Sequence, residues 1–333
     1  MTPRAVATAA VAAWAFRTLV SRQRDAPLPS LRHAPREITS NSAYPEDYYP
    51  GGQYVTLPQG EMHYFLFGPV DSDIKIVFVH GLSTPASVYS NIARHMAESG
   101  CQVLLFDLYS RGYSVGPLVD HNPELYVDQL KGLLQHVGWT RCNIVGLSLG
   151  GAISACFAHA HPEVVASLTL IAPGGVLVPA EIPLVGKIFG YLPYSEDILS
   201  HKAFRGYFSK RNVDSMKDEF KEHDQVPPVI EEAAQILELQ FRHHEGYARG
   251  LMSTLRKVPL TALHEQFRSS YEQAYQVQVI WGTRDTVVPE STVKTLQQLI
   301  PSIKVTRVEG ATHSITMTHP DKVIEQLQGF VIA

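Results

Sequence analysis

Residues 146–150 read Gly-Leu-Ser-Leu-Gly, a Gly-x-Ser-x-Gly pentapeptide that decides the fold of this chain. A strand-like run at residues 142–145 leads into it, and a helix-compatible run at residues 151–158 follows. In that context the serine sits on a sharp turn that lifts its hydroxyl clear of the sheet, and the glycines let strand and helix approach closely. The pentapeptide therefore predicts a nucleophile elbow with Ser148 as the nucleophile.

The strand-and-helix rhythm continues on the N-terminal side of the elbow and for one strand beyond it. Two runs around Pro58-Gln59-Gly60 predict a hairpin, residues 53–57 and 61–67. The apolar strand-like runs that follow alternate with helical stretches and lie at residues 74–79, 102–106, 142–145 and 167–171. Near-continuous apolar strands separated by helices predict an α/β fold, with a parallel sheet covered on both faces.

The rhythm breaks after residue 173 and resumes near residue 264. Residues 174–263 contain helical stretches without alternating strands, which indicates an inserted helical cap. Strands at residues 277–281 and 303–308 then return, each followed by a helix. We therefore predict one α/β core made of residues 53–173 and 264–333.

A serine hydroxyl needs a base and an orienting acid, in the chain order Ser, Asp or Glu, His. Asp285 follows the strand at residues 277–281, whereas the loop after residue 171 has no carboxylate. His313 follows the strand at residues 303–308, and of the chain's 15 histidines it is the one in the required place and order. We predict Asp285 as the acid and His313 as the base.

Two backbone N–H groups are needed to stabilise an oxyanion. The residue after the nucleophile, Leu149, supplies one, and the loop after the first parallel strand supplies the other, for which we choose Leu82. His80, just before that loop's glycine, is interpreted as structural. Asp107 and Arg111 follow the second parallel strand and are expected to tie loops together near the site.

These motifs together resemble the α/β-hydrolase superfamily. The resemblance covers residues 54–333 and rests on His-Gly at 80, Asp-x-x-x-Arg-Gly-x-Ser at 107, Gly-Leu-Ser-Leu-Gly-Gly at 146, Arg-Asp-x-x-Val-Pro at 284 and Gly-x-x-His at 310. It implies a mostly parallel eight-stranded sheet with helices on both faces. The cap is similar to those of monoacylglycerol-lipase-like enzymes and carbon–carbon-bond hydrolases. A serine in the elbow argues against haloalkane dehalogenases and epoxide hydrolases, which use an aspartate.

We therefore expect a serine hydrolase that cleaves a carboxylic ester of an apolar or lipid-like small molecule through an acyl-enzyme. Three alternatives stay open: a carbon–carbon-bond hydrolase, an acyltransferase or thioesterase with the same triad, and a non-catalytic binding module. Arg205 or Arg242, placed to grip an acid, would favour the carbon–carbon-bond hydrolase. The cap aromatics, of which Phe189 and Phe208 are our candidates, are expected to bind substrate unless they only pack the cap on itself.

Composition excludes other classes of function. The chain has 333 residues, a formal net charge of -4 and 18% charged residues, with no basic cluster that would suggest nucleic-acid binding. Its three cysteines lie in apolar stretches without metal-type spacing and predict no disulfide framework. The expected mechanism needs neither a metal nor an organic cofactor.

The first two dozen residues differ from the rest. Residues 1–24 hold four arginines, no acidic residue and an alanine-rich apolar run too short for a free-standing membrane span. They favour a mitochondrial transit peptide, with a secretory signal or a membrane-associating anchor helix as alternatives. Residues 25–52, rich in Pro, Ser and Tyr, are expected to form a linker that wraps onto the domain surface.

Overall fold

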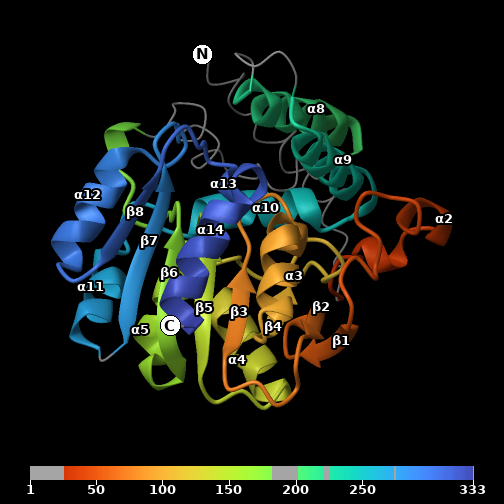
Figure 1. Cartoon of the computed structure of the whole chain (residues 1–333). Coiled ribbons are helices and arrows are strands. Elements are labelled where there is room, and N and C mark those ends of the chain that lie inside the picture. The colour runs from red at the N-terminus through yellow and green to blue at the C-terminus, as the bar shows by residue number, and fades with distance from the viewer. Residues whose placement is uncertain (1–25, 182–201, 221–225, 274, 333) are drawn as a thin grey trace, which may run out of the picture.

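One mostly parallel sheet organises the molecule (Figure 1). The structure, a computed structural model, describes residues 26–181, 202–220, 226–273 and 275–332. The eight strands run in the order β1-β2-β4-β3-β5-β6-β7-β8, and all pairs are parallel except β1 with β2 and β2 with β4. The strands are β1 (Gly52–Leu57), β2 (Gly60–Phe67), β3 (Lys75–Val79), β4 (Gln102–Phe106), β5 (Cys142–Leu147), β6 (Val165–Ile171), β7 (Gln276–Gly282) and β8 (Lys304–Val308). The predicted fold class is confirmed.

Helices cover both faces of this sheet (Figure 1). One face carries α3 (Ser90–Glu98) and α14 (Pro320–Leu327), which contact each other. The other face carries α4 (Pro123–His136) and α5 (Leu149–Ala160). Among the described residues, the core and the N-terminal segment also contain the helices η1 (Leu31–His33), α2 (Arg36–Thr39), η2 (Ala86–Tyr89), η3 (Pro162–Val164), α11 (His264–Glu272), α12 (Glu290–Leu299), α13 (Ile315–Thr318) and η5 (Gln328–Ile332).

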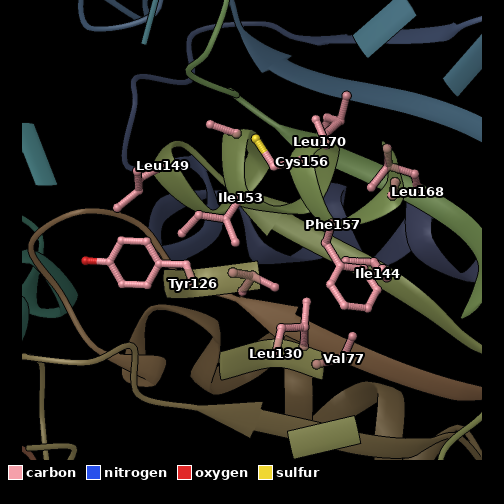
Figure 2. Close-up of a cluster of buried hydrophobic side chains, with 14 of the residues drawn as sticks. Val77, Tyr126, Leu130, Ile144, Leu149, Ile153, Cys156, Phe157, Leu168 and Leu170 are labelled. Atoms are coloured by element: carbon pink, nitrogen blue, oxygen red, sulfur yellow. The ribbon is translucent and has the colours of Figure 1, made fainter. Parts of the chain in front are cut away.

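The period-two alternation of the strands divides the core into two apolar layers. Val77 belongs to the layer that contains Ile144, Leu168 and side chains of α5 such as Phe157 (Figure 2). Its neighbour Phe78 belongs to the other layer, with the side chains of α3 and α14. Both faces of the parallel strands are therefore buried, which explains why these strands read as continuous apolar runs rather than alternating ones.

A helical insertion lies between β6 and β7. Among the described residues it contains η4 (Pro179–Glu181), α8 (Lys202–Asp218), α9 (Pro228–His243) and α10 (Tyr247–Lys257). In the view of Figure 1, α8 and α9 lie above the upper end of the sheet, and α10 runs between them and the strands. This insertion matches the predicted cap in character; its boundaries at residues 174 and 263 stay a prediction.

The segment before the first strand packs more deeply than a surface linker. Leu31, Tyr44 and Tyr49 are at most 1% exposed. Leu28 exchanges both backbone hydrogen bonds with Gly116, in the loop after β4. The segment before β1 is thus buried through apolar and aromatic side chains, although its sequence has no periodicity from which a strand or a long helix could be predicted.

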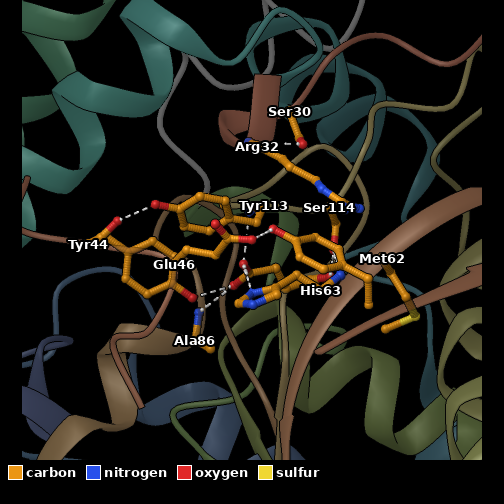
Figure 3. A network of polar contacts seen from close by, with 12 residues as sticks. Ser30, Arg32, Tyr44, Glu46, Met62, His63, Ala86, Tyr113 and Ser114 are labelled. Atoms are coloured by element: carbon orange, nitrogen blue, oxygen red, sulfur yellow. Dashed lines mark hydrogen bonds and ion pairs between the residues drawn. The ribbon is translucent and has the colours of Figure 1, made fainter. Parts of the chain in front are cut away.

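A buried polar network joins this segment to the sheet (Figure 3). The Asp107 carboxylate accepts hydrogen bonds from the Tyr44 hydroxyl at 2.9 Å, from the Ala86 N–H at 3.1 Å and from the Tyr113 N–H at 2.9 Å. Burial opposes ionisation of Asp107, but the His63 imidazole beside it and the Tyr113 N–H hold its pKa below the ordinary value. Asp107 thus ties loops together, as the sequence indicated.

Two further sequence features can be placed. Cys101, Cys142 and Cys156 are free and buried, and burial raises the pKa of the last two thiols to about 12. Within the described ranges, no helix is both long and apolar enough to cross a bilayer. The targeting hypothesis concerns residues 1–24, which lie outside the described residues.

Candidate active site

Ser148 occupies the sharp turn between β5 and α5. Its backbone has φ 53° and ψ -115°, a strained conformation for a residue with a side chain. The surrounding chain fixes this turn, because the Ser148 N–H donates to the Ile171 carbonyl and the Ser148 carbonyl accepts from Gly174. Strain that the neighbouring strands hold in place is typical of a functional turn.

The two glycines of the pentapeptide are required by close backbone contacts. A Cβ atom on Gly146 would lie 2.4 Å from the carbonyl oxygen of Gly150. A Cβ atom on Gly150 would lie 2.0 Å from the carbonyl oxygen of Val79, in the adjacent strand β3. Any larger residue at these positions would push the elbow helix away from the sheet, and Ser148 with it.

The structure brings Ser148, Asp285 and His313 together at the carboxyl ends of β5, β7 and β8. The Nε2 atom of His313 lies 3.0 Å from the Ser148 Oγ, and its Nδ1 atom lies 2.8 Å from Asp285 Oδ2. An ionised carboxylate only accepts hydrogen bonds, so this pairing assigns the imidazole proton to Nδ1. The Nε2 atom is then left to accept the serine proton.

Asp285 is itself fixed from behind. Its Oδ1 atom accepts hydrogen bonds from the backbone N–H groups of Val287 and Val288, both at 2.8 Å. The adjoining loop is tied to the His313 loop, since the Arg284 N–H donates to the Ala311 carbonyl at 2.9 Å. The carboxylate is thereby held in one orientation toward the imidazole.

The environment of His313 favours its protonated form. Burial lowers the pKa of the imidazole, but the Asp285 hydrogen bond and the negative charges of Asp285 and Glu219 outweigh it, and the pKa is raised above its ordinary value. A base that gains a proton in this setting is stabilised by the carboxylate beside it.

The two backbone groups predicted for an oxyanion hole also lie at this edge of the sheet. Leu149 begins α5, and Leu82 lines the cavity in front of Ser148. In the part of the chain that the structure describes, neither N–H has an acceptor. Two unsatisfied donors beside a nucleophile are what a developing oxyanion requires.

The loop that carries Leu82 is held by buried groups from the core and the cap. The Arg111 guanidinium, which is fully buried, donates from Nε to the Leu82 carbonyl at 3.0 Å. The Ser83 carbonyl accepts from the Gln240 side chain of α9 and from the Tyr247 hydroxyl of α10. The sequence pointed to Arg111 but not to Gln240 or Tyr247, because no local pattern marks a long-range contact to a carbonyl.

A cavity of about 230 Å³ lies over Ser148. Its described lining is divided evenly between apolar or glycine residues and residues with polar side chains, on both the core and the cap side. A concave site that combines apolar surface with polar groups can bind and orient a small molecule. The described residues that line it are Gly81, Leu82, Ser83, Thr84, Val88, Leu147, Ser148, Asn212, Met216, Glu219, Leu237, Val287, His313, Ser314, Thr316 and Met317.

The predicted aromatic pocket is not seen in the described part of the cap. Phe189 lies outside the described residues, and Phe208 lies on α8 with a side chain that is also outside them. Phe241 and Tyr247 pack against each other edge to face, with ring centroids 4.8 Å apart. Phe189 and Phe208 therefore stay predictions, while the described cap lining comes from Asn212, Met216, Glu219 and Leu237.

Other polar residues singled out in the sequence have structural partners. The Leu108 N–H donates to His80 Nε2, and burial lowers the pKa of this imidazole to about 4, so His80 is a neutral link between loops. Arg205 donates to the Glu245 carbonyl, and Arg242 pairs with Glu238 on the exposed side of α9. Neither arginine is among the described residues that line the cavity. The described residues also hold no cluster of three metal-ligating side chains.

Comparison with known sequences identifies relatives of this chain. A family model described as the alpha/beta hydrolase fold matches residues 75–320. The monoacylglycerol lipase abhd6-A of Xenopus laevis is 22% identical over 268 residues, which cover 79% of this chain and 77% of that protein. Lipase 1 of Psychrobacter immobilis is 24% identical over 285 residues, covering 83% and 82%.

Solved structures show the same fold. A thermophilic esterase from Thermogutta terrifontis superposes with a TM-score of 0.67 at 19% identity, over 84% of this chain and 98% of the esterase. The enol-lactonase of Burkholderia xenovorans superposes with a TM-score of 0.68 at 18% identity, over 84% and 100%. At these identities the likeness concerns the fold alone.

Proposed function

Because the chain belongs to the α/β-hydrolase fold family, we propose that it is a serine hydrolase that cleaves a carboxylic ester of an apolar or lipid-like small molecule. The observation that carries this proposal is the continuous contact from Asp285 through His313 to Ser148, at 2.8 and 3.0 Å. A nucleophile, a base and an orienting acid within hydrogen-bond reach form the arrangement that acyl transfer needs.

In the first half of the proposed reaction, Ser148 Oγ attacks the ester carbonyl carbon while His313 Nε2 takes the hydroxyl proton. Asp285 holds the imidazole in the correct tautomer and stabilises its charged form. The N–H groups of Leu82 and Leu149 stabilise the negative charge on the former carbonyl oxygen. His313 then gives its proton to the leaving alcohol, and the acyl group stays on Ser148.

In the second half, water replaces the alcohol. His313 takes a proton from the water as it attacks the acyl carbon, and the tetrahedral intermediate again places its charge between the two N–H groups. Return of the proton to Ser148 Oγ releases the carboxylic acid and restores the free hydroxyl. The strained elbow supports both halves, because it keeps Oγ at the wall of the cavity.

The lining supports an apolar acyl or alcohol group in the substrate. Leu82, Leu147 and Leu237 face the cavity together with Val88 and Met317. The names of the relatives, a monoacylglycerol lipase and a lipase, are consistent with an ester or lipid substrate. Neither arginine that would have favoured a carbon–carbon-bond hydrolase lies in the described lining, and we therefore favour the ester hydrolase.

The test is active-site labelling followed by a substrate panel. A fluorophosphonate probe is expected to label the purified protein once, on the peptide that carries Ser148. The same preparation is then assayed on p-nitrophenyl esters of increasing acyl length and on monoacylglycerols, alone and with added acyl acceptors. Absence of labelling together with absence of ester turnover would refute the proposal, and preferential transfer to an acceptor would reassign the protein as an acyltransferase.

A further inference from the structure

One charged residue of the cavity wall, Glu219, transfers no proton and forms no bond in the proposed reaction. Glu219 follows the end of α8, and its carboxylate accepts a hydrogen bond from the Ser314 hydroxyl at 3.1 Å, next to His313. Among the described residues that line the cavity, Glu219 is the only acidic side chain, and none is a lysine or arginine. The space in front of Ser148 therefore has a fixed negative charge.

Three cations of the described cap have partners other than Glu219. Lys217, two residues before Glu219, pairs with Glu231 at 2.5 Å. Arg242 on α9 pairs with Glu238, and Arg205 donates to the Glu245 carbonyl. The second carboxylate at the site, Asp285, is buried behind His313 and carries charge of the same sign. Within the described residues, Glu219 therefore has no lysine or arginine partner, and its charge acts on the cavity and on the His313 imidazole beside it.

We propose that Glu219 determines the charge preference of this site, admitting neutral and cationic esters and excluding esters that carry an anionic group. This inference rests on the proposed hydrolase function. A substrate carboxylate bound in the cavity would meet a like charge in a partly desolvated space, where repulsion is stronger than in water. A hydroxyl or ammonium group would instead find an acceptor in Glu219.

The same charge has a consequence for the product. Hydrolysis of the acyl-enzyme forms a carboxylic acid, which loses its proton to solvent at neutral pH and becomes an anion. Glu219 repels that anion, whereas it does not repel the neutral ester from which the anion came. The cavity is thus expected to bind the free acid weakly and to show little product inhibition.

A structural role for Glu219 makes a different prediction. If its only task were to hold the Ser314 hydroxyl, its loss would lower turnover of all esters by the same factor. A charge effect changes the ratio between esters that differ only in charge. Glu219→Gln is the suitable variant, because it removes the charge and keeps both the shape and a hydrogen-bond acceptor.

The experiment compares p-nitrophenyl esters of matched length whose acyl chain ends in a methyl, a carboxylate or a trimethylammonium group. A second series places the same three groups on the alcohol side of a butyrate ester. We expect the wild-type kcat/KM to rank trimethylammonium and methyl above carboxylate in at least one series. In Glu219→Gln the trimethylammonium-to-carboxylate ratio in that series should fall by on the order of ten-fold.

The matched control is Glu238→Gln, which removes an equal charge from the exposed face of α9. Its ratios should equal those of the wild type. A wild type that turns over the carboxylate esters as well as the neutral ones would overturn the inference without any variant. So would a folded Glu219→Gln protein with unchanged ratios. Loss of the hydrolase proposal is distinguishable, because no ester of any charge would then be cleaved.

Discussion

The described residues contain two aspartate–histidine pairs, which differ in their exposure to the cavity and in the third residue that the histidine contacts. In the pair at the cavity, Asp285 lies 2.8 Å from His313, whose other nitrogen reaches Ser148 and whose side chain is 20% exposed. In the buried pair, Asp107, which follows β4, lies 3.6 Å from His63 of β2, and both side chains are fully buried. Within the described residues, neither ring nitrogen of His63 has a hydrogen-bond partner.

The difference shows what turns such a pair into a catalytic candidate. Asp107 distributes its hydrogen bonds over a tyrosine and two backbone N–H groups from three parts of the chain, so its charge holds the fold together. Asp285 uses one oxygen for its own loop and turns the other to a histidine that faces a cavity. The residue types are the same, but only the Asp285–His313 pair has a serine hydroxyl within hydrogen-bond distance and a cavity beside it.

The largest expected effect comes from removing that nucleophile. Ser148→Ala should lower kcat by about a million-fold, as loss of the nucleophilic serine does in a serine protease. The fold should be unaffected, because the hydroxyl faces the cavity. Circular dichroism serves as the control for folding, and a variant that still reacts with a fluorophosphonate would place the nucleophile elsewhere.

The acid of the cavity pair should give the next largest effect. Asp285→Asn keeps the shape but presents an amide where His313 needs an acceptor, which favours the wrong tautomer and should cost roughly ten-thousand-fold in kcat. Its urea midpoint should stay near that of the wild type. Activity close to normal in this variant would mean that another carboxylate orients the histidine.

The buried pair should respond in the opposite way. Both oxygens of Asp107 accept hydrogen bonds, one from Tyr44 and Ala86 and the other from Tyr113. In Asp107→Asn the amide NH2 group replaces one of these acceptors and faces a donor. An unsatisfied buried donor lowers the free energy of unfolding by about 1–3 kcal/mol. Unfolding in urea should shift by that amount, while kcat per folded molecule is kept. A large loss of kcat at unchanged stability would contradict the division of roles between the two aspartates.

The Asp285–His313 pair could be predicted from the sequence, whereas the surroundings of the buried Asp107 could be predicted only in part. Ser148 directly follows β5, and Asp285 and His313 lie in the loops that follow β7 and β8. Parallel strands bring their carboxyl ends to one edge, so local motifs were enough to predict that the three residues meet. Asp107 also follows a strand, but its partner Tyr44 lies 63 residues earlier in a segment without periodicity. No local signal indicates a contact of that kind.

The cavity wall was the least predictable part. Glu219, Asn212 and Met216 come from or follow one helix whose sequence has no motif, and their approach to Ser148 depends on how the insertion packs over the sheet. Aromatic content suggested a pocket, yet Phe241 and Tyr247 pack with each other. Long-range packing decides which cap side chains face the substrate, and composition does not encode it.

A pH profile sharpens the comparison further. The carboxylates of Asp285 and Glu219 raise the pKa of His313, and the base works only when Nε2 is unprotonated, so kcat/KM should fall as the pH drops through that raised pKa. Glu219→Gln removes one of the two charges, and the acid limb for a neutral ester should therefore move to lower pH. Glu238→Gln should leave the limb in place, and an unmoved limb in Glu219→Gln would show that its charge does not reach the imidazole.

The smallest effect is expected from deletion of residues 1–24, because this deletion leaves the contacts of the buried Asp107 in place. A deletion of residues 1–24 leaves the Leu28–Gly116 bridge and the Tyr44–Asp107 hydrogen bond intact, so kcat/KM on a soluble ester should not change. A deletion of residues 1–52 also removes buried Leu31, Tyr44 and Tyr49, and it should lower the urea midpoint as Asp107→Asn does or more. Fractionation and the mass of the mature N-terminus then separate a cleaved transit peptide from a retained membrane anchor. If the shorter deletion already unfolds the protein, residues 1–24 belong to the folded domain, which contradicts both the transit peptide and the membrane anchor.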